Sequence, residues 1–87
     1  MAYQIHFLDD AIKDLKQLDK TIAQRIVKKL QWLSENISQL KPEQLSENLV
    51  GFYKLRIGDY RVIYEIFSEK NIVVIHHVGH RSTVYKG

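Results

Sequence analysis

The chain has 87 residues, no cysteine and a formal net charge of +3. This length allows one small domain, residues 1–87, near the lower limit for a chain that folds on its own apolar core. The absence of cysteine excludes a disulfide framework, a thiolate nucleophile and a cysteine-based zinc site. No stretch offers the roughly 18 apolar residues that span a membrane, and the start MAYQIHF lacks the apolar run of a signal peptide. We therefore expect a soluble, cytoplasmic protein.

Basic charge is concentrated in the C-terminal part of the chain. Residues 1–50 contain seven Lys/Arg and seven Asp/Glu, whereas residues 51–87 contain six Lys/Arg and three Asp/Glu. Binding of phosphate groups depends on a local basic patch more than on the overall charge. The distribution therefore predicts an anion-binding site in the second part.

The first part of the chain predicts a strand followed by a helical hairpin. Tyr3–Phe7 alternates apolar and polar residues, as a strand does. Asp9 can cap a helix that runs to about Asp19, and Thr21 with Gln24 fits a capping box that begins a second helix. The apolar positions at helical spacing are Ile12, Leu15 and Leu18 on the first arm, and Ile22, Ile26, Leu30, Leu33 and Ile37 on the second. We expect both faces to pack in the core, with a groove for a partner helix as the alternative.

The second part predicts three strands. Residues 38–50 are polar, and Lys41-Pro42 breaks any helix there. Apolar and polar residues then alternate in Phe52–Ile57, Tyr60–Phe67 and Ile72–Val78. The order β-α-α-β-β-β predicts an α+β fold in which a helical hairpin packs on an antiparallel β-sheet. The other face of the sheet is then left for water or a ligand.

A two-residue turn at Gly58-Asp59 predicts how the second and third strands pair. Glycine in the first position is typical of a type II′ turn, and the resulting register places Arg56 opposite Arg61. The residues expected to face the helices are Tyr53, Leu55, Ile57, Tyr60, Val62, Tyr64 and Ile66. The residues expected on the other face are Lys54, Arg56, Arg61, Ile63 and Glu65. Two opposed arginines repel each other, and a polyanion across the sheet would turn that repulsion into attraction; the alternative is a solvated polar face.

The end of the chain adds candidates to the same face. Gly79 is expected to permit a bend that brings Arg81 and Tyr85 near Arg61. A tyrosine beside arginines suits single-stranded RNA, because the ring stacks on a base while guanidinium groups bind phosphates.

Three histidines near the C-terminus give weaker signals. His80, with an ordinary pKa of about 6.5, is a candidate proton donor. His76 and Glu65 share a face in one register of the last hairpin and form an alternative acid–base pair. His76 and His77 are adjacent on a strand, so we expect them to point to opposite faces and not to form a metal site.

Two segments resemble the RelE/ParE toxin superfamily of type II toxin–antitoxin systems: YKLRIGDYRVIY, from Tyr53 to Tyr64, and VGHRSTVY, from Val78 to Tyr85. The resemblance extends over essentially the whole chain and favours the RelE-like branch. The active site of that branch has two basic residues two apart on a central strand, an arginine on the next strand, an arginine after the final strand and a C-terminal tyrosine. The matching residues are Lys54, Arg56, Arg61, Arg81 and Tyr85. Arg56 stands where RelE has lysine, and the segment from Arg81 to Tyr85 is shorter than in RelE.

The resemblance implies an mRNA endoribonuclease that acts in the ribosomal decoding site without a metal or cofactor. Its implied partners are a cognate antitoxin and the ribosome with mRNA, with operator DNA contacted only through the antitoxin and no membrane. Antitoxin docking is expected on the helical hairpin and the exposed sheet. The alternatives are a ParE-like inhibitor of DNA gyrase and a non-enzymatic RNA-binding module.

In the expected reaction the ribose 2′-hydroxyl attacks the adjacent phosphate and leaves a 2′,3′-cyclic phosphate. Arg61 and Arg81 would hold the phosphate oxygens, and Tyr85 would stack on a flanking base. Lys54 is the candidate base, with a pKa lowered by the neighbouring arginines. Arg56 would supply charge alone, because a guanidinium group hardly releases a proton.

Overall fold

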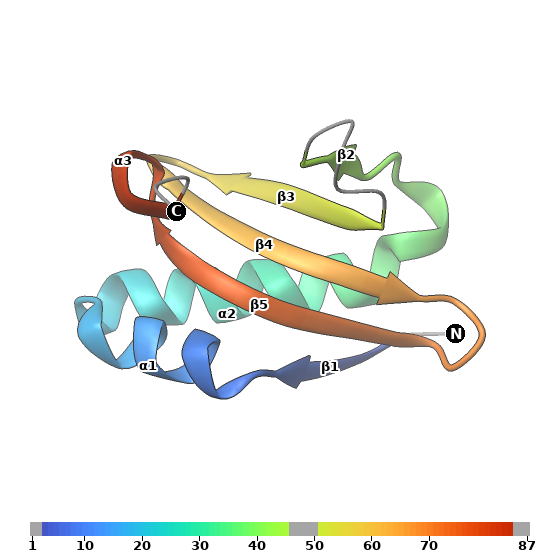
Figure 1. The fold of residues 1–87 in the computed structure, drawn as a ribbon, viewed down its shortest axis with the longest axis horizontal. Helices are drawn as coiled ribbons and strands as arrows, with labels where there is room; N and C mark the ends of the chain where they lie inside the picture. Colours follow the sequence, from blue (N-terminus) through green and yellow to red (C-terminus); the bar gives the residue numbers. More distant parts are fainter. Residues whose placement is uncertain (1–2, 46–50, 85–87) are drawn as a thin grey trace.

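A five-stranded β-sheet forms the framework of the protein, for which a computed structural model describes residues 3–45 and 51–84 (Figure 1). In chain order the elements are β1 (Gln4–Phe7), α1 (Asp9–Gln17), α2 (Lys20–Asn36), the 3-10 helix η1 (Ile37–Gln39), β2 (Glu43–Gln44), β3 (Phe52–Ile57), β4 (Tyr60–Phe67), β5 (Ile72–His80) and α3 (Arg81–Val84). The strand order is β1-β5-β4-β3-β2, with β1 parallel to β5 and the other pairs antiparallel. The expected α+β class is confirmed, and the parallel pairing of β1 is an addition to it.

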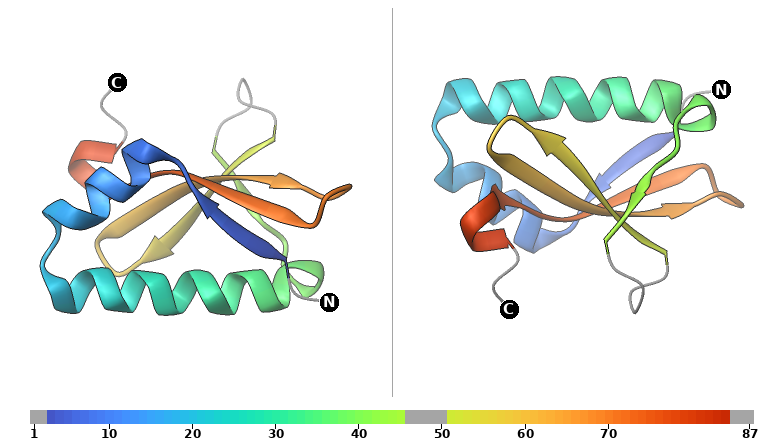
Figure 2. Two further views of the ribbon diagram at one scale, coloured as in Figure 1. Left: turned by 90° about the horizontal axis from the view of Figure 1, so that it is seen from below. Right: turned by 90° about the horizontal axis from the view of Figure 1, so that it is seen from above.

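Helix α2 lies along one face of the sheet, and none of the described helices covers the opposite face across the central strands (Figure 2). Ile26, Leu30 and Leu33 of α2 are buried against the sheet residues Val62 and Tyr64. All the residues of β3 and β4 that were expected to face the helices pack in this core. Burial of this apolar layer is the main stabilising contribution to such a fold, and it fixes the opposite residues of each strand on the open side.

Both main helices begin differently from their predicted caps. Asp9 is the first residue of α1 and not its cap, because Leu8 takes that position without a side-chain hydrogen bond. Helix α2 begins at Lys20, and the carboxylate of Asp19 accepts a hydrogen bond from the backbone N–H of Thr21 at 3.2 Å. The predicted capping box was therefore wrong, because Asp19 caps the helix before Thr21 can do so.

The inward face of α1 is also shifted from the prediction. Ala11 is completely buried, whereas Ile12 is 40% exposed. Leu15 and Leu18 pack against the core as expected. Within the described residues, no helix has the length and apolar character needed to cross a membrane.

The β3–β4 hairpin has the predicted register. Ile57 pairs with Tyr60 and Arg56 pairs with Arg61. Gly58 has a φ of 59°, and the neighbouring Asp59 is not among the described residues with positive φ. Positive φ at the first turn position alone is the mark of a type II′ turn, so the predicted turn type is confirmed.

The end of the sheet differs from the prediction. Gly79 does not bend the chain: it pairs with Arg61, and β5 continues to His80, two residues further than expected. The chain turns at Arg81, where α3 begins, and the backbone N–H of Arg81 donates to the carbonyl oxygen of Asp59 at 2.8 Å. The ladder to β4 keeps Gly79 extended, and the turn comes where this ladder ends.

Candidate functional site

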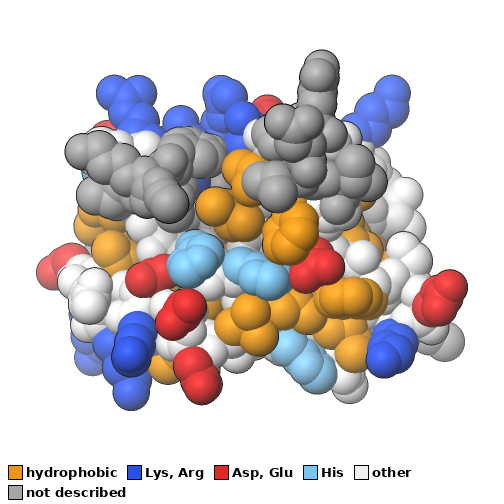
Figure 3. Space-filling view, viewed as in Figure 1, with side chains coloured by type: hydrophobic (Ala, Val, Ile, Leu, Met, Phe, Trp, Pro, Cys, Tyr) orange, Lys and Arg blue, Asp and Glu red, His pale blue; other side chains and the backbone are white. Residues whose placement is uncertain are grey.

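We call the sheet surface opposite α2 the open face. Its described residues come from four strands, and those used below are Glu43, Phe52, Lys54, Arg56, Arg61, Ile63, Glu65, His76 and His77. Figure 3 looks onto this face: Lys and Arg side chains lie along its upper margin and at its lower left and right, and histidine and hydrophobic side chains occupy the middle. The open face therefore combines a basic upper margin with a more apolar centre.

Lys54 and Arg56 converge on one carboxylate oxygen. The Nζ atom of Lys54 lies 3.1 Å from Glu43 Oε2, and the Nη2 atom of Arg56 lies 3.6 Å from the same atom. The hydrogen bond from Lys54 lowers the pKa of Glu43, and the charges of Arg56, Lys54 and Arg61 add to this effect. Two cations that meet at a single anionic oxygen form an arrangement that also fits a phosphate oxygen.

Arg61 lies on the same margin but is turned toward the hairpin. Its Nη1 atom donates to the carbonyl oxygens of Gly58 and Tyr60, each at 3.0 Å. Its backbone pairs with that of Arg56, and its charge contributes to the low pKa of Glu43. The structure thus brings Lys54 and Arg56 to one carboxylate oxygen, with Arg61 on the neighbouring strand of the same face.

His80 and Arg81 lie at the hairpin end of the sheet, beside the β3–β4 turn. The backbone N–H of Ser82 donates to His80 Nδ1 at 3.1 Å, and the Ser82 hydroxyl lies 2.8 Å from the same atom. The ring of His80 also meets Tyr60 edge-on, with 5.6 Å between centroids. Because Nδ1 accepts a hydrogen bond, a neutral His80 carries its proton on Nε2. Tyr85 lies outside the described residues, so its stacking role stays a prediction.

A second group of side chains lies in the centre of the open face. The Nε2 atom of His76 is 2.7 Å from Glu65 Oε1, so the two residues named as an alternative acid–base pair are in contact. The ring of His76 also meets the ring of Phe52 at 5.0 Å and an interplanar angle of 64°. Phe52 was not predicted as a site residue, although its spacing from Lys54 on the same strand places it on the open face.

His76 and His77 both belong to the open face, and the expectation that they point to opposite faces was wrong. The pairing of β4 with β5 shifts between Ile63 and Tyr64, so that Ile63 pairs with His77 and Tyr64 with Ile75. His76 is therefore the extra residue of a β-bulge. His77 Nδ1 lies 3.5 Å from Asp14 of α1. In the parts of the chain that the structure describes, no group of three or more His, Cys, Asp or Glu residues is arranged to hold a metal ion.

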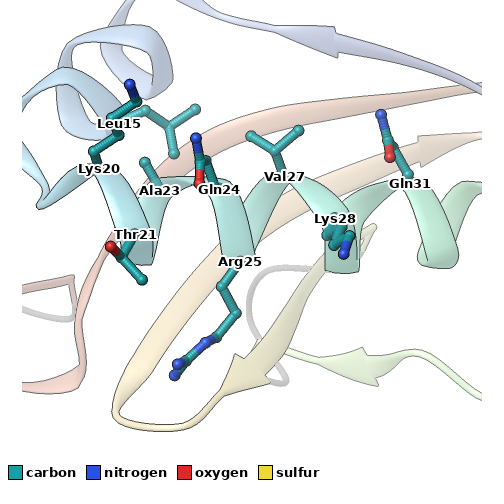
Figure 4. A pocket seen from close by; sticks show the side chains of 9 residues that line it. All are labelled: Leu15, Lys20, Thr21, Ala23, Gln24, Arg25, Val27, Lys28 and Gln31. Carbon is teal, nitrogen blue, oxygen red and sulfur yellow. The ribbon is translucent and has the colours of Figure 1, made fainter.

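Two hollows among the described residues lie away from the centre of the open face. One of 760 Å³ lies along the outer side of α2, lined by residues such as Leu15, Gln24 and Arg25 (Figure 4). A groove of 310 Å³ between α2 and β3 is lined by Trp32, Lys54 and Arg56, among others. The basic cluster therefore continues around the edge of β3 into a concave surface.

Glu43 is a second residue of the candidate site, after Phe52, that the sequence did not indicate. It lies in the polar segment 38–50, where no strand was expected, and reaches the cluster because β2 pairs Glu43 with Lys54. A two-residue strand has no detectable alternation, so no local pattern could have shown it.

Comparisons with known proteins agree with this arrangement. Residues 5–85 match the family model of the ParE toxin of the type II toxin–antitoxin system parDE. A putative RelE-like toxin protein of Escherichia coli is 36% identical over 92 residues, which cover 98% of this chain and 92% of that protein. The mRNA interferase toxin RelE of Escherichia coli strain K12 is 33% identical with the same coverage. In the crystal structure of the toxin–antitoxin complex RelBE2 from Mycobacterium tuberculosis, one chain aligns with a TM-score of 0.83 and 31% identity over 94% of both chains. This chain therefore belongs to the RelE/ParE superfamily of toxins from type II toxin–antitoxin systems.

Proposed function

We propose that this toxin is a ribosome-dependent endoribonuclease that cleaves mRNA without a metal ion. The observation that carries the proposal is the convergence of Lys54 and Arg56 on Glu43 Oε2, at 3.1 and 3.6 Å. A phosphate oxygen in place of this carboxylate oxygen would meet the same two cations. The similarity to a protein named mRNA interferase toxin RelE supports the same activity.

The nucleophile in this proposal is supplied by the RNA. The ribose 2′-oxygen forms a bond to the adjacent phosphorus, and the bond from phosphorus to the 5′-oxygen of the next nucleotide breaks. Lys54 accepts the proton of the 2′-hydroxyl, and Arg56, Arg61 and Arg81 stabilise the charge that builds on the phosphate. Tyr85 stacks on a flanking base and holds the RNA in line for attack. The products are a 2′,3′-cyclic phosphate and a 5′-hydroxyl.

The leaving 5′-oxygen requires a proton donor, and we propose the imidazolium form of His80 for this role. In that form Nδ1 also carries a proton, so the hydrogen bond that Nδ1 accepts from the N–H of Ser82 at 3.1 Å must open before the proton is donated. Arg81 follows directly at the start of α3. We assign His80 to proton donation and Arg81 to charge stabilisation, because a guanidinium group hardly releases a proton.

The proposal includes a cognate antitoxin and the translating ribosome in the cytoplasm as partners. The Mycobacterium tuberculosis structure that this chain resembles is that of a toxin–antitoxin complex. On this chain we expect antitoxin contacts on the helical hairpin, where the 760 Å³ hollow lies, and on the open face. Contact with operator DNA would then occur only through the antitoxin.

The test is controlled expression followed by primer extension on a highly translated message. Wild-type protein is expected to cut within codons, and removal of the start codon should abolish the cuts. Arg81→Ala should lower cleavage by about 10²-fold or more, the size of effect seen when a transition-state donor is removed. Lys70→Ala is the control, because Lys70 is an exposed cation in the turn between β4 and β5, at the opposite end of the sheet from the β3–β4 turn.

A ParE-like function is the second candidate, because the matching family model carries the ParE name. It predicts growth arrest with intact messages and failing chromosome segregation. That outcome would reject the nuclease and assign the toxin to inhibition of gyrase.

A further inference from the structure

The bulge in β5 changes which residues reach the open face. In a regular strand, a single outward residue separates two successive core residues. In β5 the successive core residues are Ile75 and Val78. Here there are two outward residues, His76 and His77, because His76 has no partner in the β4 ladder. Bulges are enriched beside active sites, where they redirect a side chain. This one directs His76 onto Glu65 and Phe52.

The three side chains form a cluster with both stacking and hydrogen-bonding character. His76 is 2.7 Å from Glu65 and lies edge-on to Phe52 at 5.0 Å. The side chains of His76 and Glu65 keep 23% and 26% of their surface exposed, so the pair is sheltered but reachable. A carboxylate accepts several hydrogen bonds on its two oxygens, so Glu65 can hold His76 and still accept from a ligand.

The cluster of Phe52, Glu65 and His76 is adjacent to the proposed phosphate site on the open face. Phe52 and Lys54 are two residues apart on the same side of β3, which corresponds to about 7 Å. Phe52 pairs with Glu65, and Lys54 pairs with Ile63 of the same strand. An RNA strand whose phosphate is bound by Lys54 and Arg56 would thus bring the adjoining nucleotide to Phe52 and His76.

We propose that Phe52, Glu65 and His76 form a base-binding subsite that selects the nucleotide flanking the scissile phosphate. The rings of Phe52 and His76 offer a stacking surface that any base can use. The carboxylate of Glu65 accepts hydrogen bonds from the amino group of adenine, cytosine or guanine. It repels the carbonyl oxygens of uracil and the negative backbone, so the subsite favours a base with an amino group over uracil. This inference rests on the proposed nuclease function.

The experiment is to sequence the 5′-hydroxyl ends of cleaved messages after expression of wild type and of variants. Glu65→Gln keeps the shape of the side chain but replaces an oxygen acceptor by an NH2 donor. It is expected to raise the share of uracil at one position flanking the cut by about threefold to tenfold, the range that a single base contact supplies. Glu69→Gln, the same change in the turn between β4 and β5, is the matched control and should leave the base frequencies as in wild type.

Two further variants separate the effect of stacking from the selection of the base. Phe52→Leu removes the ring but keeps an apolar side chain, so cleavage should fall by about tenfold through lost stacking, with base frequencies unchanged. His76→Asn removes the imidazole that contacts Glu65 and should relax base selection as Glu65→Gln does. Thermal unfolding of each variant verifies that the sheet is intact.

Two results would overturn the subsite while the nuclease stands. One is a folded Glu65→Gln protein that cuts with unchanged base frequencies. The other is a folded Glu65→Gln protein that cuts nowhere, because Glu65 would then act in the reaction itself. Absence of cleavage by the wild type would instead reject the proposed function, and the subsite with it.

Discussion

Glu43 and Lys54 show how the anion site is organised at the level of single residues. Glu43 Oε2 lies 3.1 Å from Lys54 Nζ and 3.6 Å from Arg56 Nη2. The carboxylate separates cations that would otherwise repel each other, and it occupies the position that we assign to phosphate. Binding of RNA therefore requires Glu43 to leave, and phosphate to take over its two contacts.

The low pKa of Glu43 predicts a pH dependence of stability. A carboxyl whose pKa is lower in the folded than in the unfolded chain stabilises the fold above its ordinary pKa of 4.5, and this contribution is lost as pH falls through the lowered value. Glu43→Gln removes the contribution, so its unfolding midpoint in urea should differ from that of wild type at pH 6 and approach it near pH 3. The difference should shrink in high salt, because the pair is exposed to solvent. A difference that is the same at both pH values would contradict this assignment.

A substitution at Lys54 can distinguish a role in proton transfer from a role of positive charge alone. Lys54→Arg keeps the positive charge but cannot accept a proton from the 2′-hydroxyl, so single-turnover cleavage on ribosomes programmed with mRNA should slow by about 10²-fold or more. Arg56→Lys is the reciprocal change at a position assigned to charge alone, and its rate should stay within about tenfold of wild type. A Lys54→Arg protein with the wild-type rate would show that Lys54 contributes only its charge.

At the level of elements, the β3–β4 hairpin determines where the cations lie. Its turn places Arg56 opposite Arg61, and the start of α3 is hydrogen-bonded to the same turn through Asp59. A shift of one residue in this register would turn the side chains of Lys54, Arg56 and Arg61 toward the core. The turn geometry therefore also sets the positions of the residues to which we assign catalysis.

Gly58 is the residue on which this turn depends. Its φ is 59°, and a Cβ atom placed there would meet nothing within 4 Å. Gly58→Ala should therefore destabilise the protein by about 1–2 kcal/mol through backbone strain alone. Urea unfolding measures the change, with Asp59→Ala as the control that should stay within about 0.5 kcal/mol of wild type. An unchanged stability of Gly58→Ala would mean that the turn adopts another type in solution.

At the level of the whole molecule, the protein has two layers, the β-sheet and a helical layer that consists mostly of α2. Helix α2 covers one face of the sheet, and the side chains of the proposed site lie on the opposite, open face (Figure 2). Leu30 is completely buried in this layer, whereas Ile12 of α1 is 40% exposed. Stability of so small a domain thus rests on few residues.

Leu30→Ala should cost about 2–5 kcal/mol, a large share of the roughly 5–15 kcal/mol by which such domains are stable. Ile12→Ala is the matched control and should cost less than about 1 kcal/mol, because its side chain is already in contact with water. Denaturant unfolding of the two variants measures both values. Equal losses would show that α1 is buried in solution to the same degree as α2.

The core face of α2, strands β3 and β4, their register and the type of their turn were all predictable from local pattern. They follow from periodicity, from Gly58-Asp59 and from side-chain alternation, each of which acts between residues close in sequence. The grouping of Lys54, Arg56 and Arg61 on one face follows from the same rules. Their roles in cleavage stay predictions that the experiments above address.

Four features depended on contacts between distant parts of the chain. The parallel pairing of β1 with β5, the bulge at His76, the extended Gly79 and the approach of Glu43 to Lys54 all join segments far apart in sequence. Local pattern carries no signal for the pairing partner, because a strand has the same alternation whichever neighbour it pairs with. The bulge leaves only the adjacent polar residues His76 and His77 as its trace in the sequence. The sequence alone therefore predicted which basic residues share one face. The contacts of Glu43 with Lys54 and Arg56, and of His76 with Glu65, followed only from the tertiary structure.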